Sequence, residues 1–292
     1  MRTVARWKAD LSLVGITFIW GTTFVLVKSA LDDVSTLLFL GLRFSLAAAV
    51  LAILARRVRI DRALVAGSLL VGTSLFAGYL LQTLGLRWTT PSKSAFITAF
   101  SVPLVPVLMG LAFRRFAGWG PLGGITAATA GLYFLTVPAG IGALNRGDLL
   151  TLGCALAFAL HIILLGRFTR VLPTLGLAAG QIIVAALLSL AAVPWAEPAT
   201  LRFSAVLLIA IVVTGLFATA LAFSVMTWAQ RYTTPTYAAL IFSLEPLFAW
   251  LASWALMGEQ LRGREVLGAF LILAGVIAAE LLRSKEEVTS DE

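Results

Sequence analysis

The sequence predicts an all-α polytopic membrane protein in which ten transmembrane helices form two inverted five-helix repeats. Three observations support this prediction: the apolar composition, the long stretches without charge, and a repeat of the first half in the second. Apolar residues make up 60% of the 292-residue chain and charged residues 12%, whereas roughly a quarter of the residues in soluble domains are charged. A chain of this composition is expected in a lipid bilayer rather than in water.

The charged residues gather in short clumps and leave long apolar stretches between them. Seven stretches contain no charged residue, and three more qualify if one ionisable group is allowed inside, namely Arg43, Glu245 or Glu280. Each has the ~17 residues that a helix needs to cross a hydrocarbon layer of about 30 Å. In chain order the ten predicted spans are residues 11–27, 34–55, 63–86, 94–113, 116–145, 149–166, 171–196, 203–230, 232–258 and 266–282.

These spans are predicted to be helices. Backbone polar groups inside a bilayer need partners within the protein, so only helices and closed β-barrels cross it. The stretches are too long and too uniformly apolar for the alternating strands of a barrel. One membrane domain then accounts for the chain, and residues 284–292 are expected to form a solvated acidic tail on the cytoplasmic side.

The net charge of +8 arises from basic residues in the short connections. They form no patch or known nucleic-acid-binding motif, so no nucleic-acid partner is expected. The positive-inside rule explains them instead, and it places both termini in the cytoplasm of a multi-pass protein of the inner (plasma) membrane. A cleaved signal peptide is disfavoured, because nine further spans follow the first one. Cys154 is the single cysteine, so no intramolecular disulfide forms.

The second half of the chain repeats features of the first in the same order. The pentapeptide RWTTP at 87–91 returns as RYTTP at 231–235. Further matches, at separations of 138 to 145 residues, join Asp10 to Asp148, Gly15 to Gly153, Trp20 to Phe158 and Pro103 to Pro246. Five spans per half is an odd number, so the halves 1–145 and 146–283 would enter the bilayer from opposite faces. Inverted repeats of this kind provide a structural basis for alternating access.

Four segments of the chain carry a family resemblance: WGTTFVLVK (20–28), LRFSLAAAVL (42–51), PSKSAFITAFSVPLVPVL (91–108) and SLEPLFAWLASWALMGEQLRGREVLGAFLILAGV (243–276). They resemble the EamA branch of the drug/metabolite transporter superfamily. The last is the most specific, with a Glu-Pro pair inside the ninth span and a Gly-Glu pair at its end; the matching first-half turn FRRFAGWG lacks that glutamate. The resemblance implies ten helices around a central cavity lined by helices one to four and six to nine. It also implies transport of a small metabolite, and many bacterial members are exporters.

Two ionisable residues lie near the middle of predicted spans, where a charge costs a few kcal/mol and marks a functional candidate. Glu245, roughly 15 Å into its span, is a candidate for coupling transport to protons; the alternative is a hydrogen bond to a neighbouring helix. Arg43 and its match Gln181 are candidates for an anion contact. The interpretation that we favour for Arg43 is a position near the outer interface, paired with Asp32 or Asp33.

Aromatic and polar side chains at helical spacing are predicted to line the cavity. Trp20 with Thr23, and Phe158 with His161, are matched pairs in which residues three apart share a helix face. Such pairs suit a small amphipathic pocket, although a lone histidine in an apolar helix is more often packed and hydrogen-bonded.

Two more spans contribute candidates. Tyr79 and Gln82 share a face of the third span and are also predicted to line the cavity. In the fourth span, Phe96 and Phe100 line the pocket if their face is inward, and contact lipid otherwise.

Lys93 and Tyr237 occupy matching positions just after the two pentapeptides. Lys93 is a gate candidate and Tyr237 a cavity candidate. The alternatives are a snorkelling lysine and an interfacial tyrosine.

The leading hypothesis is a secondary active transporter that moves a small metabolite, an amino acid or similar amphipathic solute, across the inner membrane. Export by alternating access is favoured, and proton coupling is left open. The alternatives are an importer or antiporter of phosphorylated solutes or nucleotide sugars and, more distantly, a channel or structural membrane protein. No Walker motif, metal-ligand cluster or catalytic set is found, so no enzyme activity, cofactor or metal is expected. The oligomeric state is left open.

Overall fold

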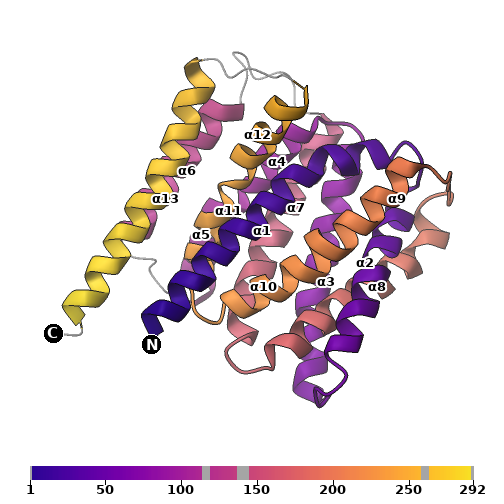
Figure 1. Cartoon of the computed structure of the whole chain (residues 1–292), viewed down its shortest axis with the longest axis horizontal. Helices are drawn as coiled ribbons and strands as arrows, with labels where there is room; N and C mark the ends of the chain where they lie inside the picture. Colours follow the sequence, from indigo (N-terminus) through magenta and orange to yellow (C-terminus); the bar gives the residue numbers. More distant parts are fainter. Residues whose placement is uncertain (1, 114–118, 137–144, 258–262, 291–292) are drawn as a thin grey trace.

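Residues 2–113, 119–136, 145–257 and 263–290 are described by a computed structural model (Figure 1). Most of these described residues lie in helices. Within the described ranges no β-strand forms, and the only β-type pairing is an isolated bridge between Val34 and Leu201. The predicted all-α class is therefore confirmed.

The helices follow one another with short connections. In chain order they are α1 (Arg2–Ala30), α2 (Thr36–Leu54), α3 (Arg62–Leu86), α4 (Pro91–Ala99), α5 (Ser101–Phe113), α6 (Trp119–Thr136), α7 (Arg146–Phe168), α8 (Thr174–Ala196), α9 (Ala205–Val212), the π-helix η1 (Val213–Leu221), α10 (Ala222–Ala229), α11 (Pro235–Phe242), α12 (Glu245–Met257) and α13 (Gly263–Ser290).

Eight helical segments in the described ranges are long and apolar enough to cross a membrane. Three of them combine consecutive helices: α4 with α5, α9 with η1 and α10, and α11 with α12. The structure thus confirms a polytopic helical membrane protein. The other two predicted spans overlap α6 and α13, and the apolar part of α13, Val266–Ala279, is shorter than the eight segments.

The helix α13 continues through Ser290, so most of the expected tail is helical. Residues 114–118 of the FRRFAGWG turn and the Gly-Glu pair at 258–259 lie outside the described residues.

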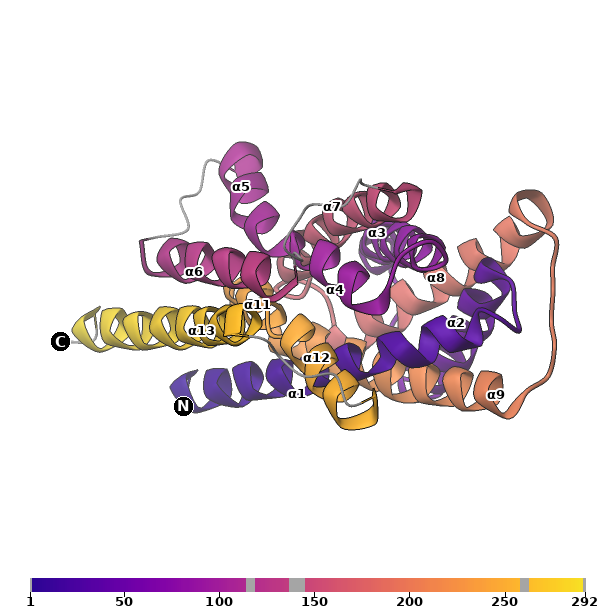
Figure 2. The same ribbon diagram turned by 90° about the horizontal axis from the view of Figure 1, so that it is seen from above.

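The helices α6 and α13 pack side by side at one edge of the bundle, whereas α2 and α8 lie toward the opposite edge (Figures 1 and 2). Glycines allow the first pair to approach closely: a Cβ atom on Gly124 would lie 2.7 Å from the carbonyl oxygen of Gly275. Small residues commonly serve this purpose between membrane helices. The first turns of α1 and the last turns of α13 lie at the same end of the molecule (Figure 1).

The two pentapeptide copies adopt the same local structure. Thr90 caps α4 by accepting a hydrogen bond from the backbone N–H of Lys93, and Thr234 caps α11 through the N–H of Tyr237. A proline begins each helix, at 91 and 235, where its missing N–H costs little. Each helix then ends within ten residues, and a second helix, α5 or α12, continues after the break.

Candidate functional site

A cavity of about 80 Å³ lies between the helices, with side chains from both halves of the chain on its walls. Its aromatic residues are Trp20, Tyr79, Phe158, Phe223 and Phe242. Its main polar residues are Thr23, Arg43, Gln82, Thr98, His161 and Glu245. Apolar walls with a few convergent polar groups are typical of small-molecule sites. Eight of the thirteen residues singled out from the sequence line this cavity: Trp20, Thr23, Arg43, Tyr79, Gln82, Phe158, His161 and Glu245.

The aromatic residues form a connected wall. The ring of Trp20 lies 5.5 Å from that of Phe223 and 5.3 Å from that of Phe242, measured between centroids. Tyr79 makes an edge-to-face contact with Phe158 at 5.3 Å. Aromatic pairs at these separations add stability beyond the area they bury, so this wall gives the cavity a defined shape.

The guanidinium group of Arg43 is held inside the protein. Arg43 is only 4% exposed, and its Nε donates a hydrogen bond to Thr219 Oγ1 at 2.7 Å. Its Nη2 donates to Tyr79 Oη at 3.2 Å, and its Cζ lies 4.5 Å from the centroid of the Tyr79 ring. No carboxylate of the described residues forms an ion pair with it.

The favoured pairing of Arg43 with Asp32 or Asp33 is therefore wrong. Asp33 instead accepts a hydrogen bond from Ser204 Oγ at 2.5 Å, in the connection that precedes α9. The reason is the orientation of α2, which directs Arg43 toward η1 and the cavity instead of toward the loop that follows α1.

The π-helix η1 shapes the wall beside Arg43. The carbonyl oxygen of Ala218 accepts hydrogen bonds from Trp20 Nε1 at 2.9 Å and from Arg43 Nη2 at 3.4 Å. Thr219 Oγ1 donates to the carbonyl oxygen of Thr214 at 2.7 Å, five residues back. π-Helical turns within α-helices often occur at functional sites. The apolar pattern of this span contains no signal for the π-helix, so sequence reasoning missed Ala218 and Thr219.

Glu245 is the first residue of α12, directly after the break that ends α11. Pro246 follows it at the start of the helix, where the missing N–H costs little. A carboxylate is favourable at a helix N-terminus because of the helix dipole. Among the described residues, none forms a hydrogen bond or ion pair with the Glu245 carboxylate, which is the single carboxylate on the described cavity wall.

His161 belongs to a chain of hydrogen bonds that leads away from the cavity. Its Nε2 lies 2.8 Å from Gln181 Oε1, and Gln181 Nε2 donates to Thr227 Oγ1 at 3.1 Å. Gln181 is fully buried, and both ends of its amide are engaged. It does not line the cavity beside Arg43, so their predicted joint anion contact is not formed.

Four further candidates lie outside the cavity lining. Phe96 and Phe100 contact each other, with ring centroids 5.2 Å apart, and Phe100 is 37% exposed at the surface. Tyr237 is buried in a small apolar cluster that includes Ile125 of α6. Lys93 lies at the N-terminal end of α4.

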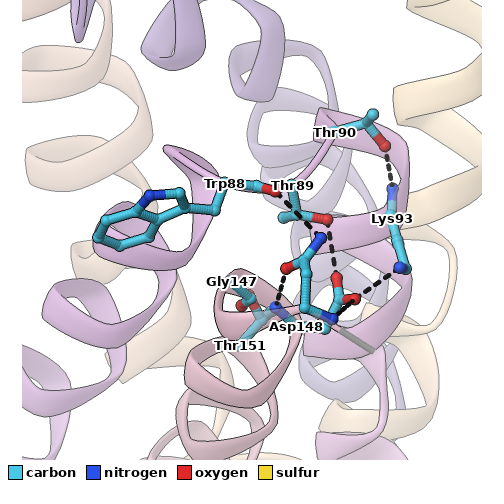
Figure 3. Close-up of polar contacts among 8 residues, drawn as sticks. Trp88, Thr89, Thr90, Lys93, Gly147, Asp148 and Thr151 are labelled. Atoms are coloured by element: carbon cyan, nitrogen blue, oxygen red, sulfur yellow. Dashed lines mark hydrogen bonds and ion pairs between the residues drawn. The ribbon is translucent and has the colours of Figure 1, made fainter. Parts of the chain in front are cut away.

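Lys93 contributes to a polar cluster where the RWTTP segment meets the start of α7 (Figure 3). Its Nζ lies 2.5 Å from Asp148 Oδ2, and Thr89 Oγ1 donates to Asp148 Oδ1 at 2.9 Å. Asn145 and Asp148 form a reciprocal capping box at the start of α7. Lys28 of α1 adds hydrogen bonds to carbonyl oxygens of this segment, including that of Thr89 at 3.3 Å.

The matching positions in the other half contain different groups. Asp10 matches Asp148 and forms an ion pair within α1, in which its Oδ2 lies 3.9 Å from Arg6 Nε. Tyr237 occupies the position that matches Lys93. The two ends of the molecule therefore differ in the way charges hold the helices together.

These features define a polytopic membrane protein with a buried, charged and aromatic cavity, which is the organisation of a solute transporter. The model of the EamA-like transporter family matches residues 7–137 and again residues 145–280. The chain belongs to this family and is a membrane transporter of the drug/metabolite transporter type.

Known relatives agree with this assignment. The chain is 34% identical over 280 residues to an uncharacterized transporter of Archaeoglobus fulgidus, in an alignment covering 95% of this chain and 87% of that protein. It is 23% identical over 299 residues to the uncharacterized transporter YoaV of Bacillus subtilis, covering 96% and 99%. A solved crystal structure with 21% sequence identity superposes with a TM-score of 0.79, covers 97% of this chain and 99% of that one, and shows the same fold.

Proposed function

We propose that the protein is a secondary active transporter that moves a small zwitterionic, amphipathic solute, such as an amino acid, across the membrane, with export as the favoured direction. The observation that carries the proposal is the pair Arg43 and Glu245. They place a guanidinium group and a carboxyl group on the wall of one cavity, and no ion pair among the described residues joins either of them to another charged group.

Unpaired charges inside a membrane protein are costly. A zwitterion relieves both costs at once, because its carboxylate pairs with the Arg43 guanidinium and its ammonium with the Glu245 carboxylate. The guanidinium suits a carboxylate geometrically, since its planar fork of donors matches the two oxygens. The aromatic wall receives the apolar part of the solute.

The repeat supports alternating access. The two pentapeptide segments have the same capped, proline-started structure, and the family model matches the chain twice in succession. We assign the Lys93–Asp148 ion pair to a gate that is closed in this state, at the end of the cavity where α4 meets α7. The opposite gate, around Asp10 and Tyr237, would then open when this one closes.

A phosphorylated solute fits the cavity less well. Arg43 is the single lysine or arginine on the described cavity wall, and Lys93 is engaged by Asp148. A diphosphate group requires more positive charge than one guanidinium supplies.

Transport assays in liposomes test the proposal. Purified protein should take up labelled amino acids saturably, and should discriminate against the matching amines, which lack the carboxylate, and the matching acids, which lack the ammonium group. Arg43→Gln should raise the KM for the amino acid at least about tenfold and remove discrimination against the amine. Glu245→Gln should remove discrimination against the acid.

Arg57→Gln provides the matched control. Arg57 is exposed in the connection between α2 and α3, outside the cavity, so the KM should not change. Equal transport of the amino acid and its amine by the unaltered protein would contradict the zwitterion site, and unsaturable ion conductance would favour a channel.

A further inference from the structure

The hydrogen-bond chain behind His161 has a defined direction. The carbonyl oxygen of Phe223 can only accept, and Thr227 Oγ1 donates its one proton to it at 2.5 Å. Thr227 Oγ1 must therefore accept from Gln181, which requires the Gln181 NH₂ group on that side. The carbonyl oxygen of the Gln181 amide then faces His161, where it can only accept.

This direction determines the tautomer of His161. Because Gln181 Oε1 has no proton, His161 Nε2 must carry one and donate it. In a neutral imidazole the second nitrogen, Nδ1, is then an acceptor. Nδ1 makes no hydrogen bond with a described residue, and it is not one of the fully buried polar atoms that lack a partner. The imidazole ring itself lines the cavity. Its lone pair is therefore available to a bound solute.

We propose that His161 is a specificity-determining residue whose Nδ1 accepts a hydrogen bond from an O–H or N–H group on the side chain of the solute. Gln181 and Thr227 are positioning residues that hold the ring in the required tautomer. This inference rests on the proposed function, in which Arg43 binds the carboxylate and Glu245 the ammonium group. With these two groups of the solute already bound, the donor to His161 Nδ1 must come from the side chain of the solute. The preferred solutes are therefore amino acids with a hydroxyl or N–H group in the side chain.

Solutes of the same shape should differ in affinity according to whether they can make this hydrogen bond. A valine and a threonine differ by one hydroxyl group in place of a methyl group. A site built around a hydrogen bond rejects the analogue that cannot make it, because the buried polar group is left unpaired. We expect kcat/KM for threonine to exceed that for valine at least about tenfold, and the same preference for tyrosine over phenylalanine.

The first test is spectroscopic and does not require transport. His161 is the single histidine of the chain, so protein labelled with ¹⁵N-histidine and purified through a tag without histidine gives one set of imidazole signals. We expect a protonated Nε2 and an unprotonated Nδ1. Thr227→Val removes the acceptor of the Gln181 amide and should introduce the other tautomer, whereas Thr227→Ser should retain the original one. A protonated Nδ1 in the unaltered protein would overturn the inference.

The second test measures the preference for hydroxylated solutes in liposomes. His161→Phe should bring the threonine-to-valine ratio of kcat/KM near one, Thr227→Val should lower it, and Thr227→Ser should preserve it. If Thr227→Val instead changes kcat/KM equally for threonine and valine, the ratio stays the same. That outcome would mean a structural role only and would overturn the positioning role of Thr227.

The outcomes also separate the two proposals. Saturable, Arg43-dependent amino-acid flux with a ratio near one in the unaltered protein would overturn the role of His161 only. Absence of saturable amino-acid flux would overturn the proposed function and, with it, this inference.

Discussion

Lys93 and Asp148 form an ion pair, with Nζ and Oδ2 2.5 Å apart, that joins the first turn of α4 to the first turn of α7 (Figure 3). The Asp148 side chain is fully buried, whereas that of Lys93 is 36% exposed. The same carboxylate accepts hydrogen bonds from Thr89 and from the backbone of Asn145. One buried charge therefore ties together the RWTTP segment, α4 and α7 at this end of the cavity.

Replacing Lys93 should make this end open more often. Lys93→Gln leaves the buried Asp148 carboxylate without its cation, and hydrogen bonds to charged groups contribute about 1.5–3 kcal/mol, less where one partner is exposed. Cys154, the single cysteine, is fully buried, and its Sγ lies 3.8 Å from the Oγ1 of Thr98 on the cavity wall. We expect a membrane-impermeant maleimide to label Cys154 severalfold to about tenfold faster in Lys93→Gln.

Two variants control for this experiment. Lys93→Arg retains the ion pair and should keep Cys154 protected. Arg146→Gln removes an exposed charge from the same turn of α7 and should also leave the labelling rate unchanged. An equal rate in Lys93→Gln and the unaltered protein would argue against a gate at this position.

A pH gradient should act on transport through Glu245, the one carboxylate on the described cavity wall. If proton movement is coupled to solute movement there, a proton gradient accelerates flux in the unaltered protein. Glu245→Gln should abolish that acceleration while saturable solute exchange persists. Asp61→Asn, at an exposed helix cap outside the cavity, should keep the acceleration. Undiminished gradient dependence in Glu245→Gln would exclude this residue as the coupling group.

The contact between Thr219 and Arg43 should influence solute affinity. Thr219→Val removes the acceptor of Arg43 Nε, so the guanidinium loses the bond that orients it toward the cavity. We expect the KM for the transported solute to rise severalfold to about tenfold, with kcat less affected. Thr219→Ser keeps the hydroxyl group and should restore the KM. If the valine and serine variants behave alike, the hydroxyl has no orienting role.

The close approach of α3 and α7 should not tolerate a side chain at Gly85. A Cβ atom there would lie 2.5 Å from Thr151 Oγ1 and 2.7 Å from the carbonyl oxygen of Gly147, and the backbone oxygen cannot move aside alone. Gly85→Ala should destabilise the protein by about 1–3 kcal/mol and lower its unfolding temperature in detergent. Gly15→Ala, with nothing within 4 Å of the added atom, should not. Equal unfolding temperatures would show that the helices adjust freely.

Several features of the site follow from local sequence. The prolines at 91 and 235 suit the start of a helix, and in the structure each begins one, with Thr90 or Thr234 as its cap. Glu245 and His161 were candidates because polar groups are rare in apolar spans, and both line the cavity. The position of Arg43 was predicted wrongly, because its loop neighbours in the sequence are not its neighbours in space. Its shortest hydrogen bond joins it to Thr219, 176 positions away in the sequence.

The sequence by itself determined the solvent of this protein and the local structure that follows from it. Hydropathy is a sum over one continuous segment, and a membrane helix satisfies its backbone hydrogen bonds within itself, so the spans can be read without knowledge of their partners. The tertiary structure alone decided which side chains meet. Lipid and protein interior are both apolar. The two faces of a membrane helix therefore differ little in polarity, and the sequence does not show which face points inward. The partners of Arg43, the hydrogen-bond chain behind His161 and the π-helix therefore depend on how the helices pack, and only the tertiary structure shows them.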